Sequence, residues 1–379
     1  MIITDVKLHN ICGFRNFEAN FTYPKKIVNS SIANEHLDGV KNFRYRKINV
    51  LAGANASGKT SFGRALNAVF IYLGLRDPNR LISLVSNMKA DAIASVELVT
   101  EENIFYSVNI RIKASKKLLN EKVLTCIRSY EIKETDNYTK CCEAIEKQKV
   151  EFKPFNPDDL EMFSTIGWNF TFTDDNSTFS SVLGNSNQAK LFEITKGLLK
   201  TLDPSISAVD PIDDKRKANA FLIRFHDTDK VVISNDGDIS DPNKLLSRGT
   251  GDALKIASLV YSVLDHKQGF YYCDEQFSFI QSDFEQAILS LLADNISNHE
   301  QLFFTTHNLD LLEMDFPLHS YSFFRKDTAV KEEPIQLIHA DDYIKKNTTS
   351  LRNAVENDLF RTAPDTSPIF ELQSLIEKS

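Results

Sequence analysis

A glycine-rich segment that begins at Gly53 matches the pattern G-x-x-x-x-G-K-[ST] at every position through Thr60. In this motif the glycines let the backbone wrap around phosphate oxygens, Lys59 reaches the β- and γ-phosphates, and the Thr60 hydroxyl binds Mg²⁺. The segment therefore predicts a P-loop that binds a nucleoside triphosphate with magnesium. The residues expected to contact the nucleotide are Gly53, Ala54, Asn55, Ala56, Ser57, Gly58, Lys59, Thr60 and Ser61.

An apolar run at Gly269–Cys273 ends in two acids, Asp274 and Glu275. A P-loop alone is compatible with kinases, GTPases and many ATPases, so downstream segments decide between these classes. A short buried strand ending in two acids is the layout of a Walker B motif. In that motif Asp274 would hold the water shell of Mg²⁺ and Glu275 would polarise the attacking water. A solvated acidic turn after a buried strand is the alternative interpretation.

Two further segments stand in an informative order along the chain. Ser247 and Gly249 are small residues before an apolar helical pattern, and small residues at a helix N-terminus can form a second anion site. His307 ends the expected strand Gln301–His307, and an imidazole at the carboxyl end of a core strand can hydrogen-bond a γ-phosphate and distinguish ATP from ADP. Taken alone, the segment with Ser247 and Gly249 would be interpreted as a capped turn, and His307 as a structural histidine. We call the segment with Ser247 and Gly249 the signature segment. The order P-loop, signature segment, Walker B motif and His307 favours an ATPase.

The elements around these motifs must bring them together. Residues 46–52 alternate into an apolar strand that ends at the P-loop, and apolar residues recur at helical spacing over 62–73. A strand, a loop and a helix in this order are the context that a P-loop requires. Alternating apolar residues at 106–112 predict a strand of an antiparallel sheet, and residues 221–233 predict a hairpin that leads into the signature helix.

With these motifs the chain resembles the ABC-type ATPases grouped with SMC and RecF proteins. The closest resemblance is to the OLD-like ATPases found in abortive-infection and other anti-phage defence systems. It covers roughly residues 1–335. Residues 276–282 depart from the turn usual in these families, and Gln188 is available as a Q-loop glutamine but its surroundings do not single it out. The segments that carry the resemblance are Leu8–Phe17, Gly53–Thr60, Ser247–Thr250 and Thr305–Asn308.

The resemblance implies an α/β fold, that of a P-loop NTPase with an ABC-type head. Such a head has a mixed sheet flanked by helices, an antiparallel β subdomain and a small helical or mixed insertion lobe. The resemblance also implies hydrolysis of ATP with Mg²⁺ in two composite sites of a head-to-tail homodimer or higher oligomer. In each site Ser247 and Gly249 of one subunit would cap the γ-phosphate held by the other. The implied catalytic residues are Lys59, Glu275 and His307, and the implied metal ligands are Thr60 and Asp274.

We expect four parts along the chain. An N-terminal ATPase lobe with the P-loop spans 1–113, and a mixed, mainly helical insertion or lid subdomain spans 114–218. A second ATPase lobe with the signature, Walker B and switch histidine spans 219–335, and a C-terminal tail spans 336–379. SMC-like proteins insert long coiled coils in the middle region, but this chain has no sustained heptads there, so we expect a short globular arm.

Composition limits the remaining possibilities. The 379 residues are 42% hydrophobic and 25% charged, and no apolar run approaches the roughly 20 residues of a membrane span. The start lacks an export signal, so we expect a cytoplasmic protein without a membrane partner. The net charge of −8 disfavours general attraction to nucleic acid, which stays possible only through a local basic cluster. That cluster is Arg111, Lys113, Lys116, Lys117, Lys122 and Arg128.

The leading hypothesis is a sensor or regulatory ATPase subunit of an anti-phage defence system. The tail is too short to hold a nuclease domain, so we expect a separate effector protein, a nuclease or toxin. The apolar residues of the tail suit docking of a partner or of the chain's own head. The alternatives are a RecF/SMC-like DNA-binding repair ATPase and a nucleotide-gated scaffold with negligible turnover.

Overall fold

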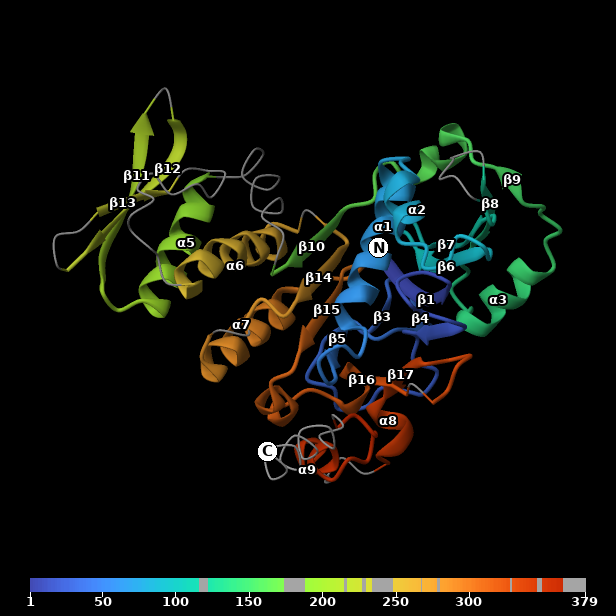
Figure 1. The fold of residues 1–379 in the computed structure, drawn as a ribbon. Helices are drawn as coiled ribbons and strands as arrows, with labels where there is room; N and C mark the ends of the chain where they lie inside the picture. Colours follow the sequence, from blue (N-terminus) through green and yellow to red (C-terminus); the bar gives the residue numbers. More distant parts are fainter. Residues whose placement is uncertain are drawn as a thin grey trace, which may run out of the picture.

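The chain folds around two six-stranded sheets with helix α1 (Lys59–Gly74) packed between them (Figure 1). None of the helices in the part of the chain that is described is long and apolar enough to cross a membrane. The computed structural model describes residues 1–115, 122–173, 188–214, 217–226, 230–233, 248–266, 268–277, 280–327, 329–345 and 350–363.

The central sheet carries the strands that precede the predicted motifs. Its first five strands in spatial order are parallel, and the last runs antiparallel to its neighbour. Three of the strands, β5, β14 and β15, are buried at every position, as expected for parallel strands covered on both faces. The spatial order is β10 (Trp168–Phe172), β14 (Phe270–Asp274), β15 (Gln301–Thr306), β5 (Ile48–Ala52), β16 (Tyr321–Lys326) and β17 (Ile335–His339).

The second sheet is antiparallel and alternates buried with partly exposed positions, most regularly in β6. Its outer face is covered by helix α3 (Tyr138–Glu146) and by the two-stranded sheet of β3 (His36–Leu37) and β4 (Val40–Arg44). The spatial order is β2 (Phe17–Asn20), β1 (Ile2–His9), β6 (Ala92–Val99), β7 (Ile104–Ile112), β8 (Val123–Glu131) and β9 (Lys153–Pro154).

Helix α1 lies unusually close to the central sheet. A Cβ atom on Gly63 would lie 2.4 Å from Cε1 of Tyr272 in β14, so only glycine fits against this ring. The Tyr272 hydroxyl donates to the carbonyl oxygen of Lys59 at 2.8 Å, which ties the first turn of the helix to the same strand. The P-loop is therefore fixed relative to β14.

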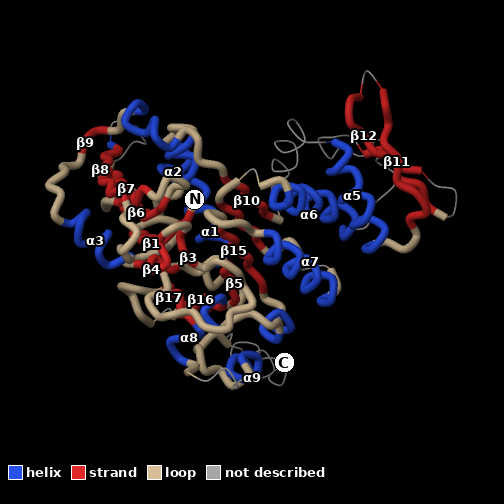
Figure 2. Tube along the Cα trace, turned by 180° about the vertical axis from the view of Figure 1, so that it is seen from behind, coloured by secondary structure: helices blue, strands red, loops and turns tan. Residues whose placement is uncertain are grey.

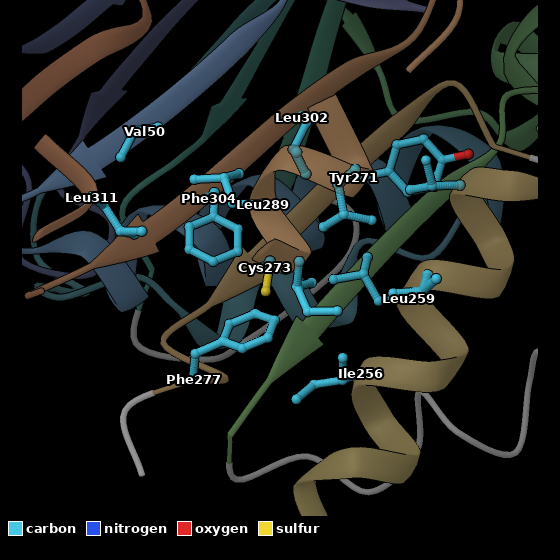
Figure 3. Packing of buried hydrophobic residues seen from close by; sticks show 14 of the residues in the cluster. Val50, Ile256, Leu259, Tyr271, Cys273, Phe277, Leu289, Leu302, Phe304 and Leu311 are labelled. Atoms are coloured by element: carbon cyan, nitrogen blue, oxygen red, sulfur yellow. The ribbon is translucent and has the colours of Figure 1, made fainter. Parts of the chain in front are cut away.

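The other face of the central sheet is covered by α6 (Arg248–Leu264) and α7 (Ser282–Asn295). In Figure 3, Ile256 and Leu259 of α6 lie beside the green strand β10, which pairs with the strand that carries Cys273. Helix α5 packs along α6 and leads into a three-stranded sheet, and this lobe projects from one side of the molecule (Figure 2). The lobe consists of α5 (Gln188–Leu202), β11 (Ile206–Asp214), β12 (Lys217–Phe225) and β13 (Lys230–Ile233).

A buried polar network lies where β5 begins, which we call the amino end of the central sheet. Arg46 donates through Nη1 to Oδ1 of Asp341 at 2.9 Å and to the carbonyl oxygen of His319 at 2.6 Å. The Nε2 atom of His319 lies 2.6 Å from Oε1 of Glu35. Gln301 accepts from the Ile3 N–H at 2.8 Å and donates to the carbonyl oxygens of Ile3 (3.2 Å) and Arg46 (2.9 Å). This network joins β1 and the central sheet.

Short elements complete the chain. They are α2 (Asn79–Ser83), η2 (Pro157–Phe163), η3 (Leu309–Glu313), η4 (Leu318–Ser320), α8 (Ala340–Tyr343) and α9 (Leu351–Glu356).

The middle of the chain differs from the mainly helical insertion expected at 114–218. Strands β8 and β10 lie in this range, yet β8 joins the antiparallel sheet and β10 forms the edge of the central sheet. The reason is that a strand's pairing partner is distant in sequence and leaves no local signal. The strand predicted at 106–112 and the hairpin predicted at 221–233 are present, as part of β7 and as β12 with β13. The four-part division itself stays a prediction.

Candidate functional site

The P-loop connects β5 to α1 through a backbone path that needs glycine. Gly53 has a φ of 151° and Gly58 a φ of 117°, and between them Ala56 has a φ of 61°. A Cβ on Gly53 would lie 2.7 Å from the carbonyl oxygen of Phe324. Helix α1 then begins at Lys59, so the amide groups of its first turn are available for an anion.

Lys59 is buried beneath this loop, with 3% of its side chain exposed. Its Nζ atom donates to the carbonyl oxygens of Gly53 at 2.7 Å and Ala54 at 3.2 Å. It also lies 3.1 Å from Oε1 of Glu275, at the end of β14. The ammonium group therefore joins the P-loop to the predicted Walker B acids.

The first acid, Asp274, is 2% exposed and lies beside Thr305 in the register of β14 and β15. The Thr305 hydroxyl donates to Oδ1 of Asp274 at 2.8 Å. Burial raises the pKa of Asp274 above its usual 3.8, and hydrogen bonds with the hydroxyls of Thr305 and Thr60 oppose this only in part. A divalent cation would favour the ionised carboxylate, so the site suits a metal ligand.

The second acid, Glu275, lies between two cationic or potentially cationic groups. Its backbone has a φ of 48°, and its N–H donates to the Thr305 hydroxyl at 3.1 Å. Its Oε1 faces Lys59, and its Oε2 lies 4.0 Å from Nδ1 of His307. The carboxylate is one-quarter exposed and the imidazole about half exposed, so solvent can reach both.

The turn that carries His307 is held by α7. The buried Glu285 accepts from the Thr306 hydroxyl at 3.1 Å and from the Asn308 side-chain amide at 2.8 Å. Asn308 also donates to the Ser282 hydroxyl at 2.9 Å. Burial raises the pKa of Glu285 despite these donors. Glu285 thus restrains the residues on both sides of His307.

The structure brings together most of the residues selected from the sequence. Lys59, Asp274, Glu275 and His307 converge at the carboxyl end of the central strands through the contacts given above. Within the P-loop, the side chain of Ser57 is buried, whereas Asn55 is exposed and Ser61 is half-buried.

Only part of the signature segment lies in the described ranges. Gly249 lies in the first turn of α6, and Ser247 lies outside the described residues. Gln188 begins α5. In the basic cluster, Arg111 lies over the ring of Phe152, with 4.6 Å between its Cζ atom and the ring centroid. Lys116 and Lys117 lie outside the described part.

Two buried residues that position the site, Thr305 and Glu285, were not assigned a role from the sequence. The doublet Thr305-Thr306 before His307 is visible in the sequence. Its hydrogen-bond partners on β14 and α7 depend on strand register and helix packing, which a single sequence does not reveal. Glu285 stands in an amphipathic helical pattern, where an acid ordinarily faces solvent.

The residues present fit a magnesium–nucleotide complex. Ser57 Oγ is buried and has no hydrogen-bond partner within the described structure, so the loop retains an unused polar group. Thr60 and Asp274 offer the hard oxygen ligands that Mg²⁺ prefers. Within the described ranges, no group of three or more His, Cys, Asp or Glu side chains is arranged to hold a metal ion by itself.

Comparison with known proteins supports the fold. No protein-family model matches the sequence, and no curated protein matches it. An SMC head bound to the C-winged-helix domain of ScpA is 12% identical with a TM-score of 0.54, over 91% of this chain and 100% of that one. An Smc head with an extended coiled coil, bound to the C-terminal domain of ScpA derived from Pyrococcus furiosus, is 10% identical with a TM-score of 0.51, over 94% and 98%. The chain therefore has the fold of an ABC-type ATPase head.

Proposed function

We propose that this chain binds ATP with Mg²⁺ at the P-loop and hydrolyses it. The observation that carries the proposal is the convergence of Lys59, Asp274 and Glu275, with Glu275 within 3.1 Å of the lysine and 4.0 Å of the His307 imidazole. A bound Mg²⁺ would neutralise charge on the phosphates, and Thr60 and Asp274 would hold it.

Each residue has a separate task in this proposal. Lys59 would exchange its bonds to the P-loop carbonyls for bonds to the β- and γ-phosphates. Glu275 would accept a hydrogen bond from the attacking water and orient it. His307 would contact the γ-phosphate and so respond to its presence or loss. Catalysis would rest on positioning and electrostatic stabilisation, as is usual for phosphoryl transfer.

We further propose that two copies associate head to tail around two nucleotides. The exposure of Glu275 and His307 supports this, because a second subunit would exclude water from a site that is open in one chain. Ser247 and Gly249 of the partner would then complete the site through the N-terminus of α6.

In the cell, we propose a cytoplasmic regulatory ATPase that acts in anti-phage defence through a separate nuclease or toxin. The motif resemblance to OLD-like ATPases supports this role. The alternative, a SMC/RecF-like DNA-binding repair ATPase, gains support from the likeness to SMC heads, whose solved structures carry the partner ScpA. A nucleotide-gated scaffold with negligible turnover is the third candidate.

The first test is light scattering of the wild type and Glu275→Gln with and without ATP and Mg²⁺, together with phosphate release. We expect phosphate release from the wild type, and dimerisation on ATP that is more stable in Glu275→Gln because its metal ligands are intact. Glu18→Gln is the matched control, because Glu18 is exposed on β2 and pairs with Lys7. Unchanged phosphate release in Glu275→Gln would exclude this mechanism.

The same assay separates the three roles. Stimulation of phosphate release by duplex DNA at low salt, lost when Arg111 and Lys113 are neutralised, would favour the repair ATPase. ATP-driven assembly without phosphate release would favour the scaffold. Release that is indifferent to DNA and changed by a co-expressed effector would favour the defence role.

A further inference from the structure

The ends of β14 and β15 are joined by one buried hydroxyl group. Thr305 is 1% exposed and is paired in register with Asp274. Its hydroxyl donates to Oδ1 of Asp274 at 2.8 Å and accepts from the N–H of Glu275 at 3.1 Å. A hydroxyl has one proton, so acceptance from Glu275 directs that proton to Asp274. One side chain therefore contacts both predicted Walker B acids.

The contact with Glu275 matters because its backbone is held in an uncommon conformation. A φ of 48° places Glu275 in the left-handed region, which is strained for a residue other than glycine. Such a conformation persists when surrounding bonds hold it, and the N–H bond to Thr305 is one of them. In this conformation the carboxylate lies 3.1 Å from Nζ of Lys59 and 4.0 Å from Nδ1 of His307.

The contact with Asp274 restrains the other acid. Because Oδ1 accepts from Thr305, the carboxylate cannot rotate without losing that bond in a buried environment. The orientation of Asp274 is thereby set before any cation arrives. Such preorganisation of a metal ligand by a neighbouring side chain increases metal affinity.

We propose that Thr305 is a positioning residue whose hydroxyl sets the metal ligand Asp274 and the water-orienting Glu275 in one geometry. This inference rests on the proposed ATPase function. Thr305 contacts neither water nor nucleotide in this proposal and acts through the two acids. It accounts for one of the two buried threonines at the carboxyl end of β15.

The test compares Thr305→Val, which removes the hydroxyl at nearly constant volume, with Thr305→Ser, which retains it. Thr171→Val is the matched control. Thr171 is also 1% exposed, lies on β10 at the other side of β14, and donates to Oδ1 of Asn169 at 3.0 Å. Its hydroxyl contacts neither acid, so this variant reports the general effect of losing a buried hydroxyl beside β14.

Two quantities are measured for each variant, phosphate release and the affinity of Mn²⁺ for the ATP-bound protein by electron paramagnetic resonance. We expect Thr305→Val to lose about 10-fold or more in both. Thr305→Ser should stay within about threefold of the wild type, because its hydroxyl can make the same bonds. Thr171→Val should match the wild type in both quantities.

Equal values for Thr305→Val and Thr171→Val would overturn the proposal, as would failure of serine to restore the activity and metal affinity. If valine at this position prevents folding, Thr305→Cys replaces it, since a thiol is a weaker donor. If the wild type releases no phosphate, the proposed function fails. In that case the Mn²⁺ affinity alone tests the positioning role of Thr305. A lower affinity in Thr305→Val would support this role, and an unchanged affinity would refute it.

Discussion

The two ends of the central sheet use buried polar groups in different ways. At the amino end, Arg46 and Asp341 form an ion pair in which both side chains are less than 10% exposed. At the carboxyl end, the buried Lys59 pairs with Glu275, which is 25% exposed, and Asp274 is held by hydroxyl groups rather than by a guanidinium. The buried charges at the amino end are therefore paired within the protein, whereas the carboxylates at the carboxyl end are placed to interact with a ligand.

The pKa values of the two aspartates express this difference. Burial alone would raise the pKa of Asp341, but the charge of Arg46, its hydrogen bond and Lys25 together bring it below 3.8. Burial raises the pKa of Asp274, and its donors do not reverse the shift. The ion pair at the amino end therefore stabilises the fold. At the carboxyl end, a bound cation would stabilise the ionised carboxylate of Asp274.

The sharpest test of the carboxyl end is Glu275→Gln, now measured for both activity and stability. We expect phosphate release to fall by about 100- to 10,000-fold, the range attributed to a positioned general base. We expect the free energy of unfolding to change by less than about 1 kcal/mol, because the carboxylate is partly exposed. Urea unfolding gives the second quantity, and a large destabilisation would place Glu275 with the structural residues.

Removal of one partner of the Arg46–Asp341 ion pair at the amino end should instead have a large effect on stability. Arg46→Ala leaves Asp341 buried without its main cation and should lower the free energy of unfolding by about 3–5 kcal/mol. Arg352→Ala is the control, because Arg352 also pairs with acids but is 34% exposed, and its removal should have a much smaller effect on stability. Similar losses in the two variants would contradict the contrast.

Two fully buried glutamines allow a smaller, matched comparison. Gln301→Met removes three hydrogen bonds and leaves the Ile3 N–H without its acceptor, at a cost of about 1–3 kcal/mol. Gln276 follows Glu275, and its Oε1 has no partner within the described structure. Gln276→Met should therefore cost less than about 1 kcal/mol. Urea unfolding of both variants measures the difference, and the reverse order would refute our assignment of the two ends.

The smallest expected effect is the pH dependence of the free energy of unfolding that arises from Asp341. The pKa of Asp341 is lowered in the folded state, so its contribution to stability is present above the unfolded pKa of about 3.9 and is lost as pH falls through the folded value. The difference in unfolding free energy between wild type and Asp341→Asn should be constant above about pH 5 and decrease as the pH falls below the unfolded pKa. A difference that persists in acid would show that the charge is not responsible.

The sequence was sufficient to predict the P-loop and the elements beside it, because glycine spacing and apolar periodicity are local signals. The order of motifs also selected Asp274, Glu275 and His307. In the structure Glu275 follows Asp274 and lies between Lys59 and His307. What it could not predict were contacts that depend on pairing register, such as the hydroxyl of Thr305 on both acids.

Long-range contacts account for the rest of what the sequence left unknown. Arg46 and Asp341 are 295 positions apart, and no local pattern relates them. The place of β10 beside β14 was likewise not predicted, because its apolar run fits several partners equally well. The head-to-tail arrangement stays a prediction, since Ser247 lies outside the described residues.

The close packing of α1 on β14 has a consequence for sequence variation. The space between positions 63 and 272 accommodates glycine opposite tyrosine, but a residue with a Cβ atom at position 63 would clash with the tyrosine ring. In sequences that keep this fold, we expect a residue other than glycine at position 63 only where position 272 carries a smaller side chain. The two positions should therefore covary, which aligned sequences would reveal without any measurement on the protein.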